Sequence, residues 1–457
     1  MRVLLVSTYE LGRQPLGVAT AAGALRAAGH QVRVTDLAVD QWDPTLVDDV
    51  DALAVSVPMH TAMRLADEVI DAARAYQPSL RVCAFGLYAG QAMGVDRAIA
   101  GEFEDELVEW VGGTTSGASV AVRRERSVVP DRSDLPPLDR YARLLHNGDA
   151  RPAAAVAASR GCASRCRHCP VPVVYDGRTR IVDQVAVLAD IEQLVAAGVE
   201  HVTFADPDFL NAVHHSMRTV RAMHERFPQL TFDVTTKVEL ILRHRALWPE
   251  LAELGCLFVV SALECVDDEI LEILDKGHTA AEAAEAVAVV RAAGVDLRPS
   301  LLPFTPWTTL DSLVALVDFV AANDLASNVE PVHWTIRLLL PKGSLLLDRA
   351  ELAPHLGEYD PASLSYRWVP ADPRVDQLQR ELAILVERSV DAEETPVQVF
   401  RQVAGAVRTA AGLPTALPVE LVDDSCRPRL SESWFCCAEP ITSQRVLLMS
   451  KPEGGST

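Results

Sequence analysis

Three cysteines within eight residues constrain this chain more than any other feature of its sequence. Cys162, Cys166 and Cys169 are spaced C-x3-C-x2-C, and they follow a run of small apolar residues, 152–158, that predicts a buried strand. The cysteines therefore lie on a loop that leaves the end of a strand. Thiolates on one short loop can surround a single iron–sulfur cluster, each binding one iron. Three thiolates leave the fourth iron of a 4Fe-4S cluster open to a substrate or cofactor.

This spacing resembles the cysteine loop of the radical S-adenosylmethionine (radical SAM) superfamily, whose open iron binds the amine and carboxylate of SAM. Members usually carry an aromatic residue before the third cysteine, where this chain has His168. The alternatives are a zinc site and three unrelated buried cysteines. Structural zinc sites normally use four protein ligands, and apart from His168 no downstream Cys or His has the usual spacing. The pattern favours a cluster bound by Cys162, Cys166 and Cys169.

The composition indicates a cytoplasmic protein with more than one domain. A length of 457 residues favours two to three domains. No run of about 18 apolar residues appears, and the N-terminal apolar run is too short for a signal peptide. Nine cysteines, three of them in one loop, suit a reducing compartment. A formal net charge of −21 argues against nucleic acid and an anionic membrane as partners.

Residues 1 to about 112 alternate apolar strands with helices. This pattern predicts a doubly wound parallel sheet, and ligands of such sheets bind beyond the carboxyl ends of the strands. The domain is similar to the cobalamin-binding domain in front of many radical SAM domains, although the D-x-H-x-x-G loop of some cobalamin enzymes is absent. Alternatively it is a scaffold without cobalamin, in which the one strand-end histidine is structural. The resemblance implies cofactor contacts from Tyr9, Glu10, His60, Gly86 and Tyr88.

From residue 152 to about 344 the chain repeats strand and helix in six steps. Six steps suit the partial barrel of the radical SAM fold, whose site we expect at the carboxyl ends of the strands. In that family the SAM amino group is held near the turn after the second strand, where this chain has Asp206 and Asp208. Later strand ends offer Lys237 and Glu239, and also Arg337, which can pair with a carboxylate. For each charged residue the alternative is a solvated or salt-bridged loop position.

A further stretch of the barrel carries a second resemblance. Residues 261–268 and 276–279 resemble the G-x-E-S…K-G-x-T stretch of cobalamin-type radical SAM proteins, with Cys265 in place of serine. The resemblance adds Ser261 and Glu264 to the cofactor-binding candidates.

The chain ends with two adjacent cysteines in the sequence Cys436-Cys437-Ala438-Glu439-Pro440. Adjacent Cα atoms are ~3.8 Å apart, too close for a relaxed disulfide. Together with Cys426 the pair offers three soft sulfur ligands, a set that suits trivalent arsenic. The tail resembles the radical SAM family named for a CUAEP or CCAEP ending, in which selenocysteine can replace one cysteine. Alternatives are a redox pair, an auxiliary cluster site and two buried cysteines.

We therefore predict an α/β protein in four segments. These are a cobalamin-binding-like domain over 1–126, a linker over 127–150, a partial (β/α)6 radical SAM barrel over 151–350, and a helical C-terminal extension with the cysteine tail over 351–457.

Three functions are open at this point. The first is reductive cleavage of SAM by the 4Fe-4S cluster and transfer of a SAM-derived group to a small-molecule or metalloid acceptor at Cys426, Cys436 and Cys437. Similar radical SAM enzymes move a 3-amino-3-carboxypropyl group to arsenic. The second is cobalamin-dependent methylation of carbon, and the third is a non-catalytic redox sensor. The resemblance also implies an electron donor such as flavodoxin or ferredoxin.

Overall fold

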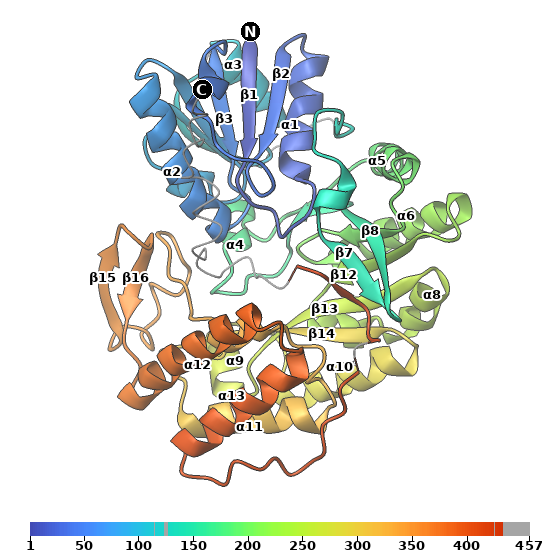
Figure 1. Ribbon diagram of the computed structural model, residues 1–457, viewed down its shortest axis with the longest axis vertical. Helices are drawn as coiled ribbons and strands as arrows, with labels where there is room; N and C mark the ends of the chain where they lie inside the picture. The colour runs from blue at the N-terminus through green and yellow to red at the C-terminus, as the bar shows by residue number, and fades with distance from the viewer. Residues whose placement is uncertain (114, 123–126, 425, 433–457) are drawn as a thin grey trace, which may run out of the picture.

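The structure, a computed structural model, describes residues 1–113, 115–122, 127–424 and 426–432. Two sheets organise this part of the chain, one in the N-terminal domain and one in the domain that follows it (Figure 1). No helix in the described ranges is long and apolar enough to cross a membrane.

The N-terminal domain is a six-stranded parallel sheet in the order β2-β1-β3-β4-β5-β6. Its strands are β1 (Arg2–Ser7), β2 (Gln31–Asp36), β3 (Ala52–Ser56), β4 (Arg81–Phe85), β5 (Arg97–Gly101) and β6 (Gly117–Ala121). Helices α1 (Leu16–Ala27) and α3 (Glu104–Val111) pack on one face, and α2 (His60–Tyr76) packs on the other. Side chains of β1, β3 and β4 feed both cores, and these central strands are accordingly largely apolar. The predicted doubly wound sheet is confirmed.

The second domain is a seven-stranded curled sheet in the order β14-β13-β12-β11-β8-β7-β17. Neighbours among β8, β11, β12, β13 and β14 pair in parallel, whereas β7 is antiparallel to β8 and β17 to β7. The strands are β7 (Arg143–His146), β8 (Asp149–Val156), β11 (His201–Phe204), β12 (Thr231–Thr235), β13 (Cys256–Glu264), β14 (Asp296–Leu301) and β17 (Arg429–Leu430). Strand β7 thus lies within 127–150, where we expected a linker.

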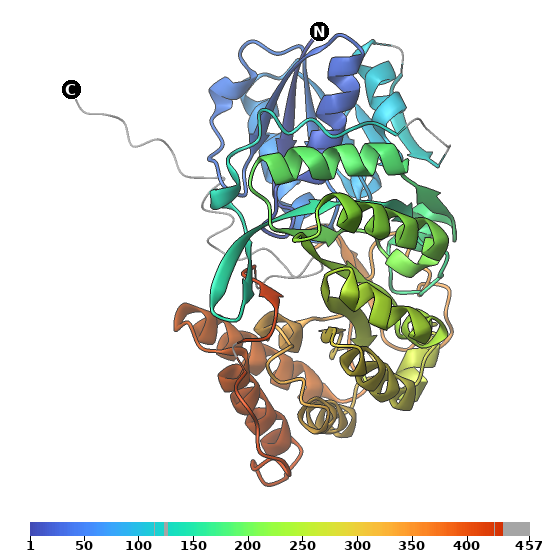
Figure 2. The same ribbon diagram turned by 90° about the vertical axis from the view of Figure 1, so that its right-hand side faces the viewer.

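Helices cover the outer face of this sheet and close its core, which gives the half-barrel expected from the sequence (Figure 2). They are α5 (Gln184–Ala196), α6 (Val213–Arg226), α7 (Val238–Arg243), α8 (Trp248–Glu253), α10 (Ala280–Ala292) and α11 (Leu310–Ala322). Local signals start several of them. Thr279 caps α10 and Thr309 caps α11, each in a reciprocal hydrogen-bonded box with the residue three positions on.

The last of the six expected strands is largely replaced by a 3-10 helix, Pro331–Thr335. Proline lacks an N–H for strand pairing, and its φ angle suits the first turn of a helix. In the described chain the strand persists only as an isolated parallel bridge between Arg337 and Phe304.

The C-terminal extension packs on the barrel rather than forming a separate core. It contains a hairpin of β15 (Leu356–Asp360) and β16 (Ser365–Trp368), followed by α12 (Pro373–Asp391) and α13 (Pro396–Ala410). Buried side chains of both helices belong to the same apolar core as the barrel strands.

Candidate active site

The three clustered cysteines lie where the sequence places them, on a loop beyond a strand end. The loop follows the short strand β9 (Ser159–Gly161) and precedes helix α4 (Val171–Tyr175). Gly161 has a φ of +70°, and a Cβ there would lie 2.3 Å from the Arg178 carbonyl oxygen. Only glycine fits this entry to the loop. Cys162 and Cys166 are buried and Cys169 is partly buried.

The loop is fastened to the end of helix α9 (Asp268–Ile273). The backbone N–H of Arg167 donates to the Leu274 carbonyl at 2.9 Å, and its guanidinium donates to the Ile273 carbonyl at 2.8 Å. These carbonyls belong to the last turn of a helix, where they have no partner within the helix. Arg167 therefore stabilises both the helix end and the loop that carries the cysteines.

A buried charged group ties the same loop to the end of β13. Glu264 accepts a hydrogen bond from His168 Nε2 at 3.0 Å and from Lys276 Nζ at 2.9 Å. Burial alone would raise the pKa of Glu264, but Lys276 and His168 hold it well below its usual range. Glu264 also has a φ of +64°, a strained conformation that clusters at functional sites. Glu264 was a predicted cofactor-binding residue, whereas Lys276, in the motif at 276–279, was not among the predicted site residues.

The sulfur atoms have the environment of cluster ligands. Asn211 Nδ2 donates to Cys162 Sγ at 3.2 Å, and the Ser164 N–H donates to it at 3.4 Å. Such hydrogen bonds tune iron–sulfur centres. Burial raises the pKa of the Cys169 thiol to about 12.

A single-metal site fits these residues poorly. Within the described ranges, no three His, Cys, Asp or Glu side chains converge closely enough to hold one metal ion. A 4Fe-4S cluster does not need such convergence, since each cysteine binds a different iron. The arrangement therefore fits the cluster better than the zinc alternative.

Next to this loop the barrel mouth holds buried polar atoms without a hydrogen-bond partner. They are Ser261 Oγ and Nδ1 of His168, whereas the ring of His278 faces the backbone of Leu263. Burial lowers the pKa of His278 to about 4, so its ring is neutral at pH 7. Buried polar groups are normally satisfied, and Ser261 Oγ and His168 Nδ1 can be satisfied by a polar ligand such as SAM. His278 was not among the predicted site residues.

The two aspartates beyond β11 connect neighbouring strand ends through hydrogen bonds. Asp206 accepts from the Ala158 N–H at 2.9 Å and from Ser159 Oγ at 2.5 Å. Asp208 accepts from Thr236 Oγ1 at 2.7 Å and from the Lys237 N–H at 3.3 Å. Burial raises the pKa of each carboxyl to about 6. Their oxygens brace neighbouring strand ends.

The remaining charged candidates divide between the mouth and the C-terminal extension. Lys237 Nζ donates to Ser164 Oγ on the cysteine loop at 3.3 Å and lies 3.5 Å from Glu239 Oε2. Arg337 pairs with Asp376 of α12 and stacks on the Trp368 ring, 3.9 Å from its centroid. Arg337 thus fastens the extension to the barrel.

The first-domain candidates gather at the carboxyl ends of β1, β3 and β4. Glu10 Oε1 accepts from the Leu16 N–H at 3.0 Å at the start of α1, and burial raises the pKa of this carboxyl to about 7. His60 begins α2, and its ring meets the edge of Tyr88 at 6.2 Å. Gly86 has a φ of +110°, and a Cβ there would lie 3.1 Å from the Val57 carbonyl oxygen. Tyr9 is buried and lines a cavity of about 300 Å³.

These strand ends face the cysteine loop. Leu87, which follows β4, and Val122, which follows β6, pack in one apolar cluster with Cys162 and Cys169. The carboxyl ends of the first-domain strands accordingly point toward α4 (Figure 1). Two expected cofactor sites are therefore brought together across the domain boundary.

Polar contacts reinforce this boundary. Tyr175 OH donates to Glu102 Oε1 at 2.9 Å, and the partly buried Arg160 pairs with Glu102 at 3.2 Å and with Glu104 at 2.6 Å. Arg160 precedes the cysteine loop, while both glutamates follow strand β5. The two domains are joined at the cysteine loop itself.

Of the predicted tail thiols, the structure describes one. Cys426 is exposed, its N–H donates to Asp424 Oδ1 at 3.1 Å and its carbonyl accepts from the Asn147 N–H at 3.1 Å. Cys436 and Cys437 lie outside the described residues.

Comparisons with known proteins agree with both halves of this arrangement. A family model of the B12 binding domain matches residues 2–111, and a model of the radical SAM superfamily matches residues 156–320. The chain is 24% identical over 340 residues to hopanoid C-3 methylase of Methylococcus capsulatus. This match covers 66% of the chain and 64% of the methylase, so the chain spans less than two thirds of that relative's length.

Solved structures share the fold. The cobalamin-dependent SAM radical enzyme OxsB with aqua-cobalamin bound has a TM-score of 0.68 at 15% identity, covering 85% of this chain and 67% of OxsB. The radical SAM methyltransferase TsrM from Kitasatospora setae, with cobalamin and a [4Fe-4S] cluster bound, has a TM-score of 0.63 at 17% identity. That match covers 90% of this chain and 99% of TsrM.

Proposed function

We propose that this chain, in which a B12-binding domain is followed by a radical SAM domain, is a cobalamin-dependent radical SAM methyltransferase. One observation carries the proposal. The cysteine loop packs against the strand ends of the first domain, through Leu87 and Val122. A methyl group carried by one cofactor has to meet a substrate activated at the other, and this contact supports a short distance between the two proposed sites.

The matched domain types confirm the predicted cofactors, a 4Fe-4S cluster, SAM and cobalamin, and the prediction of a radical SAM enzyme. When bound, these groups supply reductive cleavage of SAM and methyl transfer, and the protein supplies binding and orientation. We assign Cys162, Cys166 and Cys169 to the cluster. Ser261 is assigned to SAM or substrate, because its hydroxyl is buried and unsatisfied.

The other residues of the site control geometry and solvent. Lys276 and Glu264 hold His168, and with it the cysteine loop, in place. Val171 and Tyr175 pack with the cysteines in the apolar cluster at the domain boundary. Exclusion of water there protects reactive species from side reactions.

The named relatives favour methylation over the transfer to arsenic that we had placed first. Hopanoid C-3 methylase is a methylase by name, and TsrM is described as a methyltransferase. We therefore propose a small-molecule substrate methylated at carbon, with electrons from a flavodoxin- or ferredoxin-like donor. We also propose membership of the CUAEP/CCAEP family, on the residues of the tail.

The test uses SAM labelled with deuterium in its methyl group. Reconstituted protein loaded with cobalamin and supplied with a low-potential reductant should form S-adenosylhomocysteine and 5′-deoxyadenosine. Mass spectrometry of candidate acceptors should show gain of the labelled methyl, and protein without cobalamin should show none. Transfer of a 3-amino-3-carboxypropyl group by cobalamin-free protein would contradict the proposal. Absence of any SAM turnover would favour the redox-sensor alternative.

A thiol-held acceptor is the second candidate, and one observation supports it. Glu432 lies beside Gly12, in the loop after β1, and Cys436 is four residues further along the sequence. Replacing Cys436 and Cys437 together with serine should leave SAM cleavage intact and stop product formation. Cys83→Ser, in the buried core of the first domain, is the control and should reduce stability alone. Undiminished product from the double variant would leave the tail without a chemical role.

A further inference from the structure

The C-terminal segment beyond α13 runs back over the barrel to the first domain. We call residues 421–424 and 426–432 the C-terminal strap. Figure 2 shows its end, β17, beside the β7–β8 hairpin. Three sets of contacts hold it along this path.

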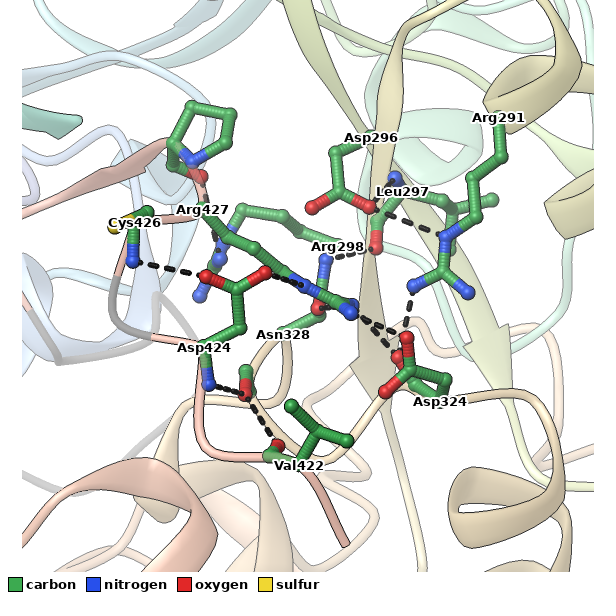
Figure 3. A network of polar contacts seen from close by, with 12 residues as sticks. Arg291, Asp296, Leu297, Arg298, Asp324, Asn328, Val422, Asp424, Cys426 and Arg427 are labelled. Atoms are coloured by element: carbon green, nitrogen blue, oxygen red, sulfur yellow. Dashed lines mark hydrogen bonds and ion pairs between the residues drawn. The ribbon is translucent and has the colours of Figure 1, made fainter. Parts of the chain in front are cut away.

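The first set anchors the strap to the barrel through Arg427. Its Nη1 donates to the Asp324 carbonyl and to Asn328 Oδ1, both at 2.7 Å, and its other guanidinium nitrogens pair with the Asp324 and Asp424 carboxylates. Figure 3 shows Arg427 between these partners. The Arg427 side chain is only 14% exposed. A guanidinium with this many directed contacts fixes the backbone that carries it.

The second set adds the strap to the barrel sheet. Arg429 and Leu430 form β17, which pairs antiparallel with Leu145 and Leu144 of β7. The Ser431 N–H donates to the Arg143 carbonyl at 2.8 Å, and Ser431 Oγ accepts from the Arg143 N–H at 2.9 Å. Main-chain pairing at a sheet edge specifies the register of an added strand.

The third set brings the strap to the first domain. Gly12 lies in the loop after β1 with a φ of +64°, and a Cβ there would lie 2.5 Å from Glu432 Oε2. The Gly12 carbonyl accepts from the Ala142 N–H at 2.7 Å. Glu432 therefore lies against the backbone of Gly12, where no side chain blocks it. Ala142 of the linker contacts the same loop.

Between the strap and this loop lies the cavity of about 300 Å³. Its wall combines polar side chains from three parts of the chain: Thr8 and Tyr9 after β1, Arg140 and Tyr141 of the linker, and Ser431 and Glu432 of the strap. It opens at the carboxyl ends of parallel strands, where such sheets bind their ligands.

We propose that the strap is part of the cobalamin-binding wall, in which Ser431 and Glu432 position the loop after β1 and receive the amide-bearing edge of the cofactor. Cobalamin carries primary amides around its corrin ring, and hydroxyl and carboxylate oxygens accept hydrogen bonds from amide N–H groups. The inference rests on the proposed function, because it takes cobalamin as the ligand of the first domain. In this inference Ser431 and Glu432 are positioning residues for a cofactor bound by the first domain.

The test measures binding of hydroxocobalamin to the full chain by equilibrium dialysis, with iron content and Tm measured in parallel. Arg427→Ala, which releases the anchor, and Glu432→Ala should each raise the Kd about tenfold or more. Glu432→Gln keeps the shape and an acceptor oxygen and should stay near the parent. Iron content should not change in any variant.

Arg408→Ala is the matched control. Arg408 lies in the same extension and pairs with Asp318 of α11 at 2.8 Å, and its side chain is 13% exposed. Its hydrogen bonds are to Asp318 and the Pro414 carbonyl rather than to the strap. It should bind cobalamin like the parent. The role of the strap would be overturned if Glu432→Ala and Arg427→Ala bound cobalamin like the parent. It would also be overturned if Arg408→Ala weakened binding equally. Neither result would bear on the proposed function. A parent that binds no cobalamin would overturn the proposed function and this inference together. If Arg427→Ala does not fold, the cobalamin Kd of Glu432→Ala, a change at the half-buried end of the strap, decides the test.

Discussion

Replacing Lys276 with methionine should destabilise the barrel more than any surface substitution. The Lys276 and Glu264 side chains are 3% and 8% exposed, and their charged atoms lie 2.9 Å apart. Methionine retains most of the apolar stem but leaves the Glu264 carboxylate buried without its cation. Removing one partner of a buried ion pair costs about 3–5 kcal/mol. Because His168 still donates to Glu264 at 3.0 Å, we expect the lower end of that range.

The double variant Lys276→Met/Glu264→Gln separates the buried charge from the packing. It removes both charges, and replacing a buried pair by neutral groups of similar volume is close to neutral in free energy. The double variant should therefore be more stable than Lys276→Met. Arg245→Met is the surface control, since the Arg245–Glu285 pair is of similar length, 2.8 Å, but its side chains are 56% and 49% exposed, and it should change stability little.

Urea denaturation and thermal unfolding, followed by circular dichroism, measure these differences. A loss of about 3 kcal/mol corresponds to a fall in Tm on the order of 10 °C for a domain of roughly 200 residues. Reconstituted Lys276→Met should also hold less iron, since His168 is held through Glu264. A single variant as stable as the parent, or a double variant that loses the sum of both single effects, would refute the coupling.

Three other predictions follow from the site. Cys166→Ala should lose cluster iron and all SAM cleavage, and retained cleavage would refute the cluster assignment. Asn211→Ala removes the hydrogen bond to Cys162 Sγ and should lower the cluster reduction potential in an EPR-monitored titration, while Asn211→Asp should lower it further because it adds negative charge. Burial lowers the pKa of His333 to about 4 from 6.5, so the unfolded chain binds more protons between these values. Stability from His333 should be complete above pH 6.5 and decrease toward pH 4 by at most about 1.4 kcal/mol per pH unit, and His333→Gln should flatten this part of the urea-midpoint profile.

The sequence was most informative where the chemistry is local. The C-x3-C-x2-C spacing predicted the cluster loop, and alternating apolar segments predicted both parallel sheets. It was less informative about individual site residues. Asp206 and Asp208, expected near SAM, have oxygens that also bind neighbouring strand ends. His278 and Lys276 lie in the motif at 276–279, but the sequence did not show that either side chain is buried, since a histidine or lysine in a loop is usually exposed.

What the sequence alone determined is the set of elements and the chemistry of the cysteine loop, because periodicity, capping residues and short-range spacing act within a few turns of chain. Only the tertiary structure decided which distant segments meet. Strand β17 is two residues long and pairs with β7, which lies more than 280 positions earlier. Leu87 meets the cysteine loop across a domain boundary, and Glu432 meets Gly12 at the other end of the chain. Such contacts depend on how whole layers pack, and no local pattern encodes them. Many partners can satisfy the backbone hydrogen bonding and burial of one segment, and only the packing of the whole core determines which of them it contacts.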